Sequence, residues 1–299
     1  MTRIRKTDDS RDVRQVTLVG MVVNIFLTAG KFVAGFLGGS QALIADAVHS
    51  ASDFLTDIAI LIGSEFWNLP PDKEHPYGHR RFETLISIGI GLAVCGVGVG
   101  IGYKGLQAIF HGEKTHPEWI AAGMALVSVL AKEGLFHYTH KKGLQIRSQA
   151  LEANAWHHRS DAFSSIPVVV AVVVAIIFPQ FGSVDEIGAV VVSVLIFKSG
   201  IEIALPGVHQ VADAGPSAEI IAKFTDVVLE CPQVISFHDM RARYIGSDLI
   251  VDLHVVVAED LTLSAAHAVA EDVESRLLHC DENVVDALVH IDPFDPLKA

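Results

Sequence analysis

The chain has 299 residues, of which 51% are hydrophobic and 19% charged, and its mean hydropathy is +0.42. This composition excludes an intrinsically disordered chain and is too apolar for a soluble globular protein, so it predicts a membrane protein. The net charge of -13 is concentrated in residues 206–299, which hold five basic and seventeen acidic residues; this argues against a nucleic-acid-binding surface and is compatible with attraction of cations.

Six apolar stretches in residues 16–205 are long enough to cross a bilayer, which takes about 20 residues each. The short loops on one side of these spans hold eleven basic residues, whereas those on the other side hold only Lys114. This asymmetry predicts that both termini are cytoplasmic, with residues 1–15 as a cytoplasmic N-terminal segment. We expect the cell (inner) membrane as the location. The expected spans are Val16–Leu37, Ala42–Ile62, Leu85–Phe110, Ile120–Phe136, Ala150–Phe178 and Ile187–Leu205.

After Pro206 the pattern changes to that of a small soluble α+β domain, residues 206–299. Its expected elements follow the order helix, strand, strand, helix, strand, with a hairpin turn at residues 245–248. The expected fold class is therefore an α-helical membrane protein with six transmembrane helices followed by a cytoplasmic αββαβ domain. The expected elements are residues 216–231, 234–244, 249–257, 264–278 and 284–291.

Two expected spans contain ionisable residues that are costly in lipid and must face a polar environment. Each span has a His and an Asp four residues apart, which places the two side chains on one face of a helix. Facing each other, the two helices would supply two imidazole nitrogens and two carboxylate oxygens, a tetrahedral set that suits Zn(II) and accepts other divalent transition metals. A hydrogen-bonded network without metal is the alternative. The four residues are His49, Asp53, His157 and Asp161.

Asp46 also lies in the second span, either as an auxiliary metal ligand or as a group that supports helix packing. His158 and Arg159 fall on other faces of the fifth span and are expected to be structural.

Two further groups of candidate ligands lie outside the spans. Asp72, His75 and His79 fall within eight residues of the loop after the second span, where they could bind one metal ion or simply be solvated. In the tail domain, side chains two apart on a strand share a face, which groups histidines with aspartates. The tail candidates are His238, His254, His290 and Asp292, with His267 on the second helix as an additional one.

The residues GSQALIADAVHSASD (39–53), DKEHPYGHRRFE (72–83), HHRSD (157–161) and the Ile291-Asp292-Pro293 segment resemble the cation diffusion facilitator family, over nearly the whole chain. This resemblance implies divalent metal efflux coupled to proton entry, by a homodimer whose tail domain has a metallochaperone-like, ferredoxin-like fold. It maps the transport site, the loop site and the tail-domain site onto the three residue groups above. It also implies a charge lock between Arg81 and Asp213.

Several bacterial members of the family have Asp at both span-two positions, whereas this chain has His49, as does the zinc-selective eukaryotic branch. The resemblance therefore favours Zn(II) as cargo and as regulatory ligand, with Fe(II), Mn(II) and Cd(II) as alternatives. We expect a transporter, not an enzyme, and the chain has no HExxH motif. The other hypothesis is a membrane scaffold that senses metal without transporting it.

Overall fold

A computed structural model describes residues 2–146, 148–181 and 183–294 of the chain. Residue 1 of the expected N-terminal segment, Arg147 and residues 295–299 of the expected tail domain lie outside the described residues. The contacts divide the chain into two units, Met1–Ala59 with Ile90–Glu202, and Ile60–Gly89 with Ile203–Ala299. We call the first the helical unit and the second the tail unit, and describe each by itself.

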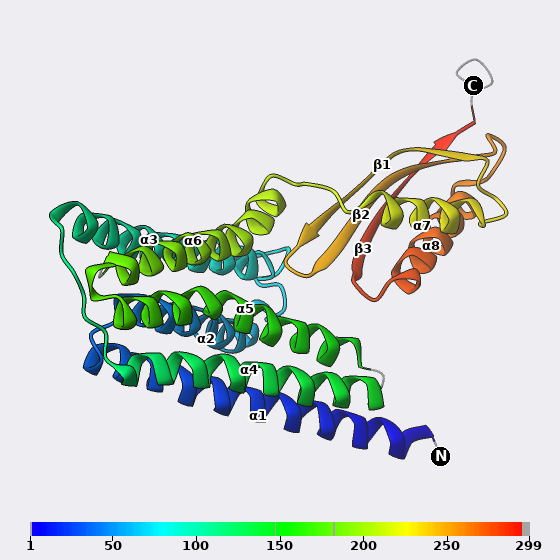
Figure 1. The fold of residues 1–299 in the computed structure, drawn as a ribbon. Coiled ribbons are helices and arrows are strands. Elements are labelled where there is room, and N and C mark those ends of the chain that lie inside the picture. The colour runs from blue at the N-terminus through cyan, green and yellow to red at the C-terminus, as the bar shows by residue number, and fades with distance from the viewer. Residues whose placement is uncertain (1, 147, 182, 295–299) are drawn as a thin grey trace. The chain divides into compact units, whose positions relative to one another are not determined.

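Six long helices correspond to the six expected spans (Figure 1). Among the described residues, five of them are long and apolar enough to cross a membrane. The sixth, α2, carries Asp46, Asp53 and Asp57 among its apolar residues. The helices are α1 Thr2–Leu37, α2 Gln41–Trp67, α3 Arg81–His111, α4 Trp119–Ile146, α5 Gln149–Ile177 and α6 Ser183–Val211, with a short 3-10 helix, η1, at Pro179–Phe181.

Two of these helices extend further than expected from the sequence. α1 begins at Thr2, so residues 2–15 of the expected N-terminal segment continue the first helix instead of forming a separate element. α6 continues to Val211, five residues beyond Pro206, because a proline removes one backbone donor without preventing the next turn from forming. The change from helical to mixed structure therefore comes after residue 211.

Small residues allow the helices of the helical unit to pack closely. α1 lies along α4, and α4 lies along α5, as Figure 1 shows. A Cβ atom on Gly98 of α3 would lie 2.9 Å from the backbone nitrogen of Phe197 on α6, and one on Gly102 would lie 2.7 Å from Ser193 Oγ. Glycine is thus required where α3 approaches α6.

The start of α2 is fixed by a carboxylate from α6. Asp185 accepts hydrogen bonds from Ser40 Oγ at 2.7 Å and from the backbone N–H of Gln41 at 2.6 Å. Ser40 Oγ also accepts from the N–H of Leu43, which satisfies one of the free donors at a helix N-terminus. These contacts hold the helix that carries His49 and Asp53.

The described C-terminal residues form the expected α+β domain, with α7 Ala218–Leu229, β1 Ser236–Ile245, β2 Asp248–Val257, α8 Leu263–Cys280 and β3 Val284–Pro293. The sheet order is β1-β2-β3, with β1 antiparallel and β3 parallel to β2. Gly246 closes the β1–β2 hairpin at φ +63°, a conformation that favours glycine.

The sheet of the tail domain has one covered face. The side chains of Val251, Leu253 and Val255 are buried against α7 and α8, which contribute Phe224 and Val273 to the same core. Alternation along β2 sends the intervening side chains, including His254, to the opposite face. The candidate tail ligands on the strands therefore lie on the face away from the helices.

Candidate metal centres

Asp53 on α2 comes together with His157 and Asp161 on α5. Each of these three side chains offers a ligand atom, and the three atoms lie within 4.8 Å of one another. His157 Nε2 lies 3.7 Å from Asp161 Oδ2, one helical turn along α5. Asp161 is 7% exposed, so its carboxylate faces the interior of the helix bundle instead of the surface. The arrangement offers one imidazole and two carboxylates to one ion.

His49 lies one helical turn before Asp53 on α2 and is buried. Its Nδ1 has no hydrogen-bond partner among the described residues. It stands outside the group of three whose ligand atoms lie within 4.8 Å. The structure therefore places three of the four expected transport-site residues together and leaves His49 beside them with a free ring nitrogen.

A cavity of about 80 Å³ lies at this cluster, in the helical unit. Asp53, His157 and Asp161 line it, together with Asn154 from α5 and Asn24 from α1. A volume of this size accommodates an ion with a few water molecules.

His158, which the sequence assigned to another face of the helix, also lines this cavity. It is 3% exposed, and neither ring nitrogen has a partner among the described residues. The expectation that His158 lies on a face away from the site was therefore wrong, whereas its expected structural role stays a prediction. Residues of α1 line the cavity beside it, and a Cβ atom on Gly20 would lie 3.2 Å from His158 Nε2.

Two buried lysines were missed by the sequence reasoning. Lys132 on α4 places Nζ 2.9 Å from Asp161 Oδ2 and lines the same cavity. Lys31 on α1 places Nζ 2.7 Å from Asp46 Oδ2 and donates to Ser50 Oγ at 3.1 Å. The available signal was a lysine inside each of two largely apolar spans, which is as costly in lipid as an aspartate.

The Asp46 carboxylate already has partners within the helical unit. Besides the ion pair with Lys31, its carboxylate accepts a hydrogen bond from Ser165 Oγ at 3.0 Å, and Asp46 is 1% exposed. It does not belong to the group with Asp53. Of the two interpretations left open by the sequence, these contacts favour a group that ties α1, α2 and α5 together.

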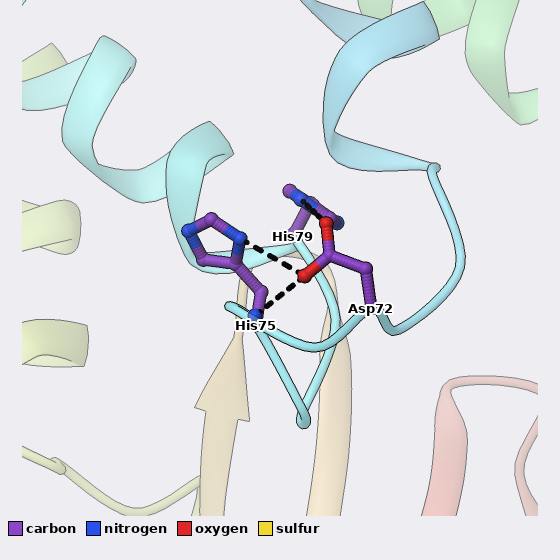
Figure 2. Close-up of side chains that lie close together, drawn as sticks. All are labelled: Asp72, His75 and His79. Atoms are coloured by element: carbon purple, nitrogen blue, oxygen red, sulfur yellow. Dashed lines mark hydrogen bonds and ion pairs between the residues drawn. The ribbon is translucent and has the colours of Figure 1, made fainter.

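The three loop candidates form a second cluster, which Figure 2 shows. Asp72 Oδ1 lies 3.4 Å from His75 Nδ1, and Asp72 Oδ2 lies 3.4 Å from His79 Nε2. The two imidazole rings are 4.4 Å apart between centroids. One carboxylate thus faces two imidazoles, which is a ligand set suited to Zn(II) or a similar ion.

The local fold of the loop builds this arrangement. Asp72 Oδ1 accepts the backbone N–H groups of Glu74 and His75, and Gly78 at φ +83° turns the chain back so that His79 meets the same carboxylate. The hydrogen bond from the His75 N–H lowers the pKa of Asp72 below its ordinary value, so the carboxylate stays charged and able to bind a cation. His79 packs against Phe82 at the start of α3.

In the tail domain, strand register aligns three histidines. His238 on β1 pairs with His254 on β2, and His254 pairs with His290 on β3. Asp292 lies beside them: its Oδ2 is 2.9 Å from His254 Nδ1 and 3.2 Å from His238 Nε2, and its Oδ1 is 3.5 Å from His290 Nε2. The hydrogen bond from His254 lowers the pKa of Asp292. His238, His254 and Asp292 form the group within 4.8 Å, with His290 adjacent.

His267 does not lie with His238, His254 and His290, the three histidines aligned across the sheet, which we call the histidine row. It lies on α8, where its Nε2 is 3.4 Å from Glu271 Oε1 and its side chain is 71% exposed. α8 packs Ala266, Val269 and Val273 against the covered face of the sheet, whereas the histidine row stands on the opposite face. The suggested fifth tail ligand is therefore separated from the others by the sheet itself.

The tail unit also contains the expected pair of charges. Arg81 Nη2 lies 3.2 Å from Asp213 Oδ1, with both side chains about half exposed. A second pair, Arg80 with Asp248 at the start of β2, was not anticipated; the Asp248 side chain is only 10% exposed. The adjacent Glu83 accepts the backbone N–H of Ser247. The contacts of Arg80 and Glu83 join the start of α3 to the β1–β2 hairpin.

Comparison with known proteins identifies the family. Residues 17–210 match the family model described as the cation efflux transmembrane domain, and residues 216–294 match that of the cation efflux protein cytoplasmic domain. The chain belongs to the cation diffusion facilitator family. The protein is therefore a multi-pass membrane transporter of divalent metal cations with a helical transmembrane domain and an α+β domain, as the sequence predicted, and it is not an enzyme.

Several cation diffusion facilitators align over nearly their full lengths. An uncharacterised transporter of Methanocaldococcus jannaschii is 35% identical over 285 residues, which cover 95% of this chain and 100% of the relative. The manganese efflux system protein MneP of Bacillus subtilis is 31% identical, covering 94% and 96% of the two chains. The manganese efflux system protein MneS of the same organism is 30% identical, covering 98% and 99%.

Proposed function

We propose that the protein exports Zn(II) from the cytoplasm in exchange for protons, using His49, Asp53, His157 and Asp161 as the transport site. The observation that carries this proposal is the group of three ligand atoms from α2 and α5 within 4.8 Å of one another, beside a cavity. His49, with a buried and unpartnered Nδ1 one turn away, would complete two nitrogens and two oxygens by a small rotation of its side chain.

Exchange for protons follows from the chemistry of these ligands. A metal ion binds neutral imidazole and ionised carboxylate, so its arrival releases protons and its departure allows them to return. If one site serves metal and protons alternately, opening that site to either side of the membrane couples the two flows.

The loop and tail clusters support a regulatory role for bound metal. In this proposal Asp72, His75 and His79 bind one ion, and His238, His254, His290 and Asp292 bind metal at the interface of a homodimer. Metal in the tail domain would stabilise the dimer and favour transport, so that export responds to the cytoplasmic concentration. Arg81 and Asp213 would act as the charge lock.

The proposed topology places residues 1–15 and 206–299 in the cytoplasm, and makes residues 16–205 a six-helix transmembrane domain in the cell (inner) membrane. It rests on the excess of basic residues in the loops on one side. The acidic tail domain would then attract the cargo on the side from which it is taken up.

Manganese is the second candidate cargo, favoured by one finding: two relatives that align over almost the whole chain are named manganese efflux system proteins. Carboxylate oxygens suit Mn(II), whereas imidazole favours Zn(II). The composition of the site and the names of the relatives therefore point to different ions, and a direct comparison of fluxes decides between them.

The test is metal flux in proteoliposomes under an imposed pH gradient, comparing Zn(II), Mn(II), Fe(II) and Cd(II). We expect Zn(II) flux that depends on the gradient and disappears in Asp161→Ala while the variant remains folded. The matched control is Asp260→Ala, at an exposed turn of the tail domain. Flux retained in Asp161→Ala would refute the assigned site. Metal binding by a folded protein without flux of any metal would instead favour a sensor or scaffold.

A further inference from the structure

One charged group at the transport cluster has no place in the exchange described above. Lys132 is 3% exposed, and its ammonium lies 2.9 Å from Asp161 Oδ2. The same oxygen faces His157 Nε2 at 3.7 Å. Lys132 thus contacts the same Asp161 oxygen that faces the other proposed ligand, His157.

We propose that Lys132 is a tethered cation that neutralises Asp161 while the site is empty and that incoming metal displaces. The inference rests on the proposed transport site. Lys132 is in this sense a positioning residue: it holds the ligand carboxylate in place and sets how tightly the site retains its cargo, without itself binding the metal.

Geometry makes the ammonium and the metal competitors. A carboxylate oxygen bound to Zn(II) lies about 2.0–2.2 Å from the ion. If Lys132 kept its 2.9 Å contact with Asp161 Oδ2, its ammonium would be no more than about 5 Å from that ion. Two cations so close together inside a helix bundle repel each other strongly, because little water screens them. Metal binding therefore requires Lys132 to move away.

The charge of Lys132 balances that of the carboxylates when no metal is bound. Without metal, Asp53 and Asp161 would put two negative charges into one small cavity within the membrane, and the ammonium of Lys132 compensates one of them. With a divalent ion bound, the two carboxylates are already neutralised and the lysine becomes the surplus charge. Lys132 thus stabilises the empty transporter and favours release of the metal.

Lys31 provides a matched control within the same unit. It too is a buried lysine paired with a buried aspartate, at 2.7 Å. Its partner Asp46 also accepts from Ser165, and Lys31 donates to Ser50, so this network is closed without any member of the ligand group. The two lysines share chemistry and burial but differ in whether their partner is a proposed ligand.

The experiment measures Zn(II) and Mn(II) binding to the full chain in detergent by competition with a chromophoric chelator. The background carries His75→Ala, His79→Ala, His238→Ala and His254→Ala, so that the transport site is read alone. Lys132→Gln, Lys132→Arg and Lys31→Gln are compared in this background, together with the thermal midpoint of each variant with and without metal. Asp161→Asn identifies the binding that belongs to the transport site.

We expect Lys132→Gln to bind metal about tenfold more tightly, equivalent to about 1.4 kcal/mol, and to unfold at a lower temperature without metal. Metal should then raise its thermal midpoint by more than it raises that of the parent. Lys132→Arg retains the charge and should bind within about threefold of the parent. Lys31→Gln should lower the thermal midpoint without tightening binding comparably.

Three results would overturn the inference. One is unchanged or weaker metal binding by Lys132→Gln in a parent that binds and transports metal, which would mean that the lysine only supports the fold. Another is a Lys31→Gln protein whose metal binding is tightened as much as that of Lys132→Gln. The third is a Lys132→Gln protein that stays unfolded even with metal, since a divalent ion should replace the missing charge. If the parent neither binds nor transports metal, or if Asp161→Asn leaves both intact, the proposed transport site itself fails and the inference with it.

Discussion

His254 Nδ1 on β2 lies 2.9 Å from Asp292 Oδ2 on β3. The two strands run parallel, and in their register His254 stands opposite His290 while Asp292 is two residues further on the same face. A carboxylate that is already hydrogen-bonded to one imidazole holds that ring in a fixed orientation, as partners of metal-ligating histidines commonly do. The row is therefore oriented in advance for a metal ion on the open face of the sheet.

We predict that His254→Ala weakens metal binding by the tail domain by at least about 10–100-fold, because losing a ligand costs no less than losing a group that supports a ligand, for which this range is found. In flux measurements the variant should need more metal to reach half-maximal rate, with a nearly unchanged maximal rate, because the transport ligands are intact. The control is Asp252→Asn on the same strand face, which lies outside the ligand group. Loss of the maximal rate in His254→Ala would contradict a purely regulatory tail site.

A second prediction concerns His49. Replacing it with aspartate exchanges an imidazole for a carboxylate and should shift preference from Zn(II) toward Mn(II). We expect the ratio of Mn(II) to Zn(II) flux in proteoliposomes to rise about tenfold, within the range that ligand surroundings commonly control. Ser52→Ala on the same helix, whose hydroxyl donates to the Val48 carbonyl, is the control. An unchanged ratio would place His49 outside the coordination shell.

The two arginines at the start of α3 should differ in their effects on stability. Burial raises the pKa of Asp248 and Arg80 opposes this, so Arg80→Ala leaves a carboxylate that is only 10% exposed without its partner. This costs about 1–3 kcal/mol of unfolding free energy. Arg81 and Asp213 are both about half exposed, and Arg81→Ala should cost about 0–1 kcal/mol. Chemical denaturation of the two variants tests whether Arg80→Ala loses more unfolding free energy than Arg81→Ala. If the Arg81–Asp213 charge lock were the more stabilising pair, Arg81→Ala would lose more.

The acid sensitivity of the tail domain supplies a fourth prediction. Asp272 on α8 accepts hydrogen bonds from the Cys231 thiol at 3.2 Å and from Arg276 Nε at 2.9 Å, and these lower its pKa. Because the pKa is lower in the folded than in the unfolded protein, the contribution to stability is complete above about pH 3.9, the ordinary value, and is lost as the pH falls through the lowered pKa.

Thermal midpoints measured across pH test this directly. The difference between the wild type and Asp272→Asn should be constant from pH 5 to 7 and shrink below about pH 4, where the wild-type carboxylate becomes protonated. Asp260→Asn, at an exposed turn, should track the wild type throughout. A difference that grows on acidification would show that the sign is wrong.

Features that depend on local periodicity could be predicted from the sequence. The spacing of four between His157 and Asp161 puts both side chains on one helix face whatever the surroundings. The alternation along β2 separates His254 from Leu253 and Val255 in the same way, so the polar face of the sheet could be predicted before its partner strands were placed. The hairpin at Gly246 and the short Asp72–His79 loop followed from residues close together in the chain.

Which distant side chains meet depends on tertiary packing and could not be predicted from the sequence. Register, set by the packing of β1 and β3 on β2, aligned the three histidines and left His267 behind the sheet. The rotation of α4 against α5 places Lys132 beside Asp161. The packing of α1 pairs Lys31 with Asp46 and brings residues of α1 to the cavity that His158 lines. These contacts join residues far apart in the chain, and a local pattern holds no information on the relative rotation of two helices or the register of two strands.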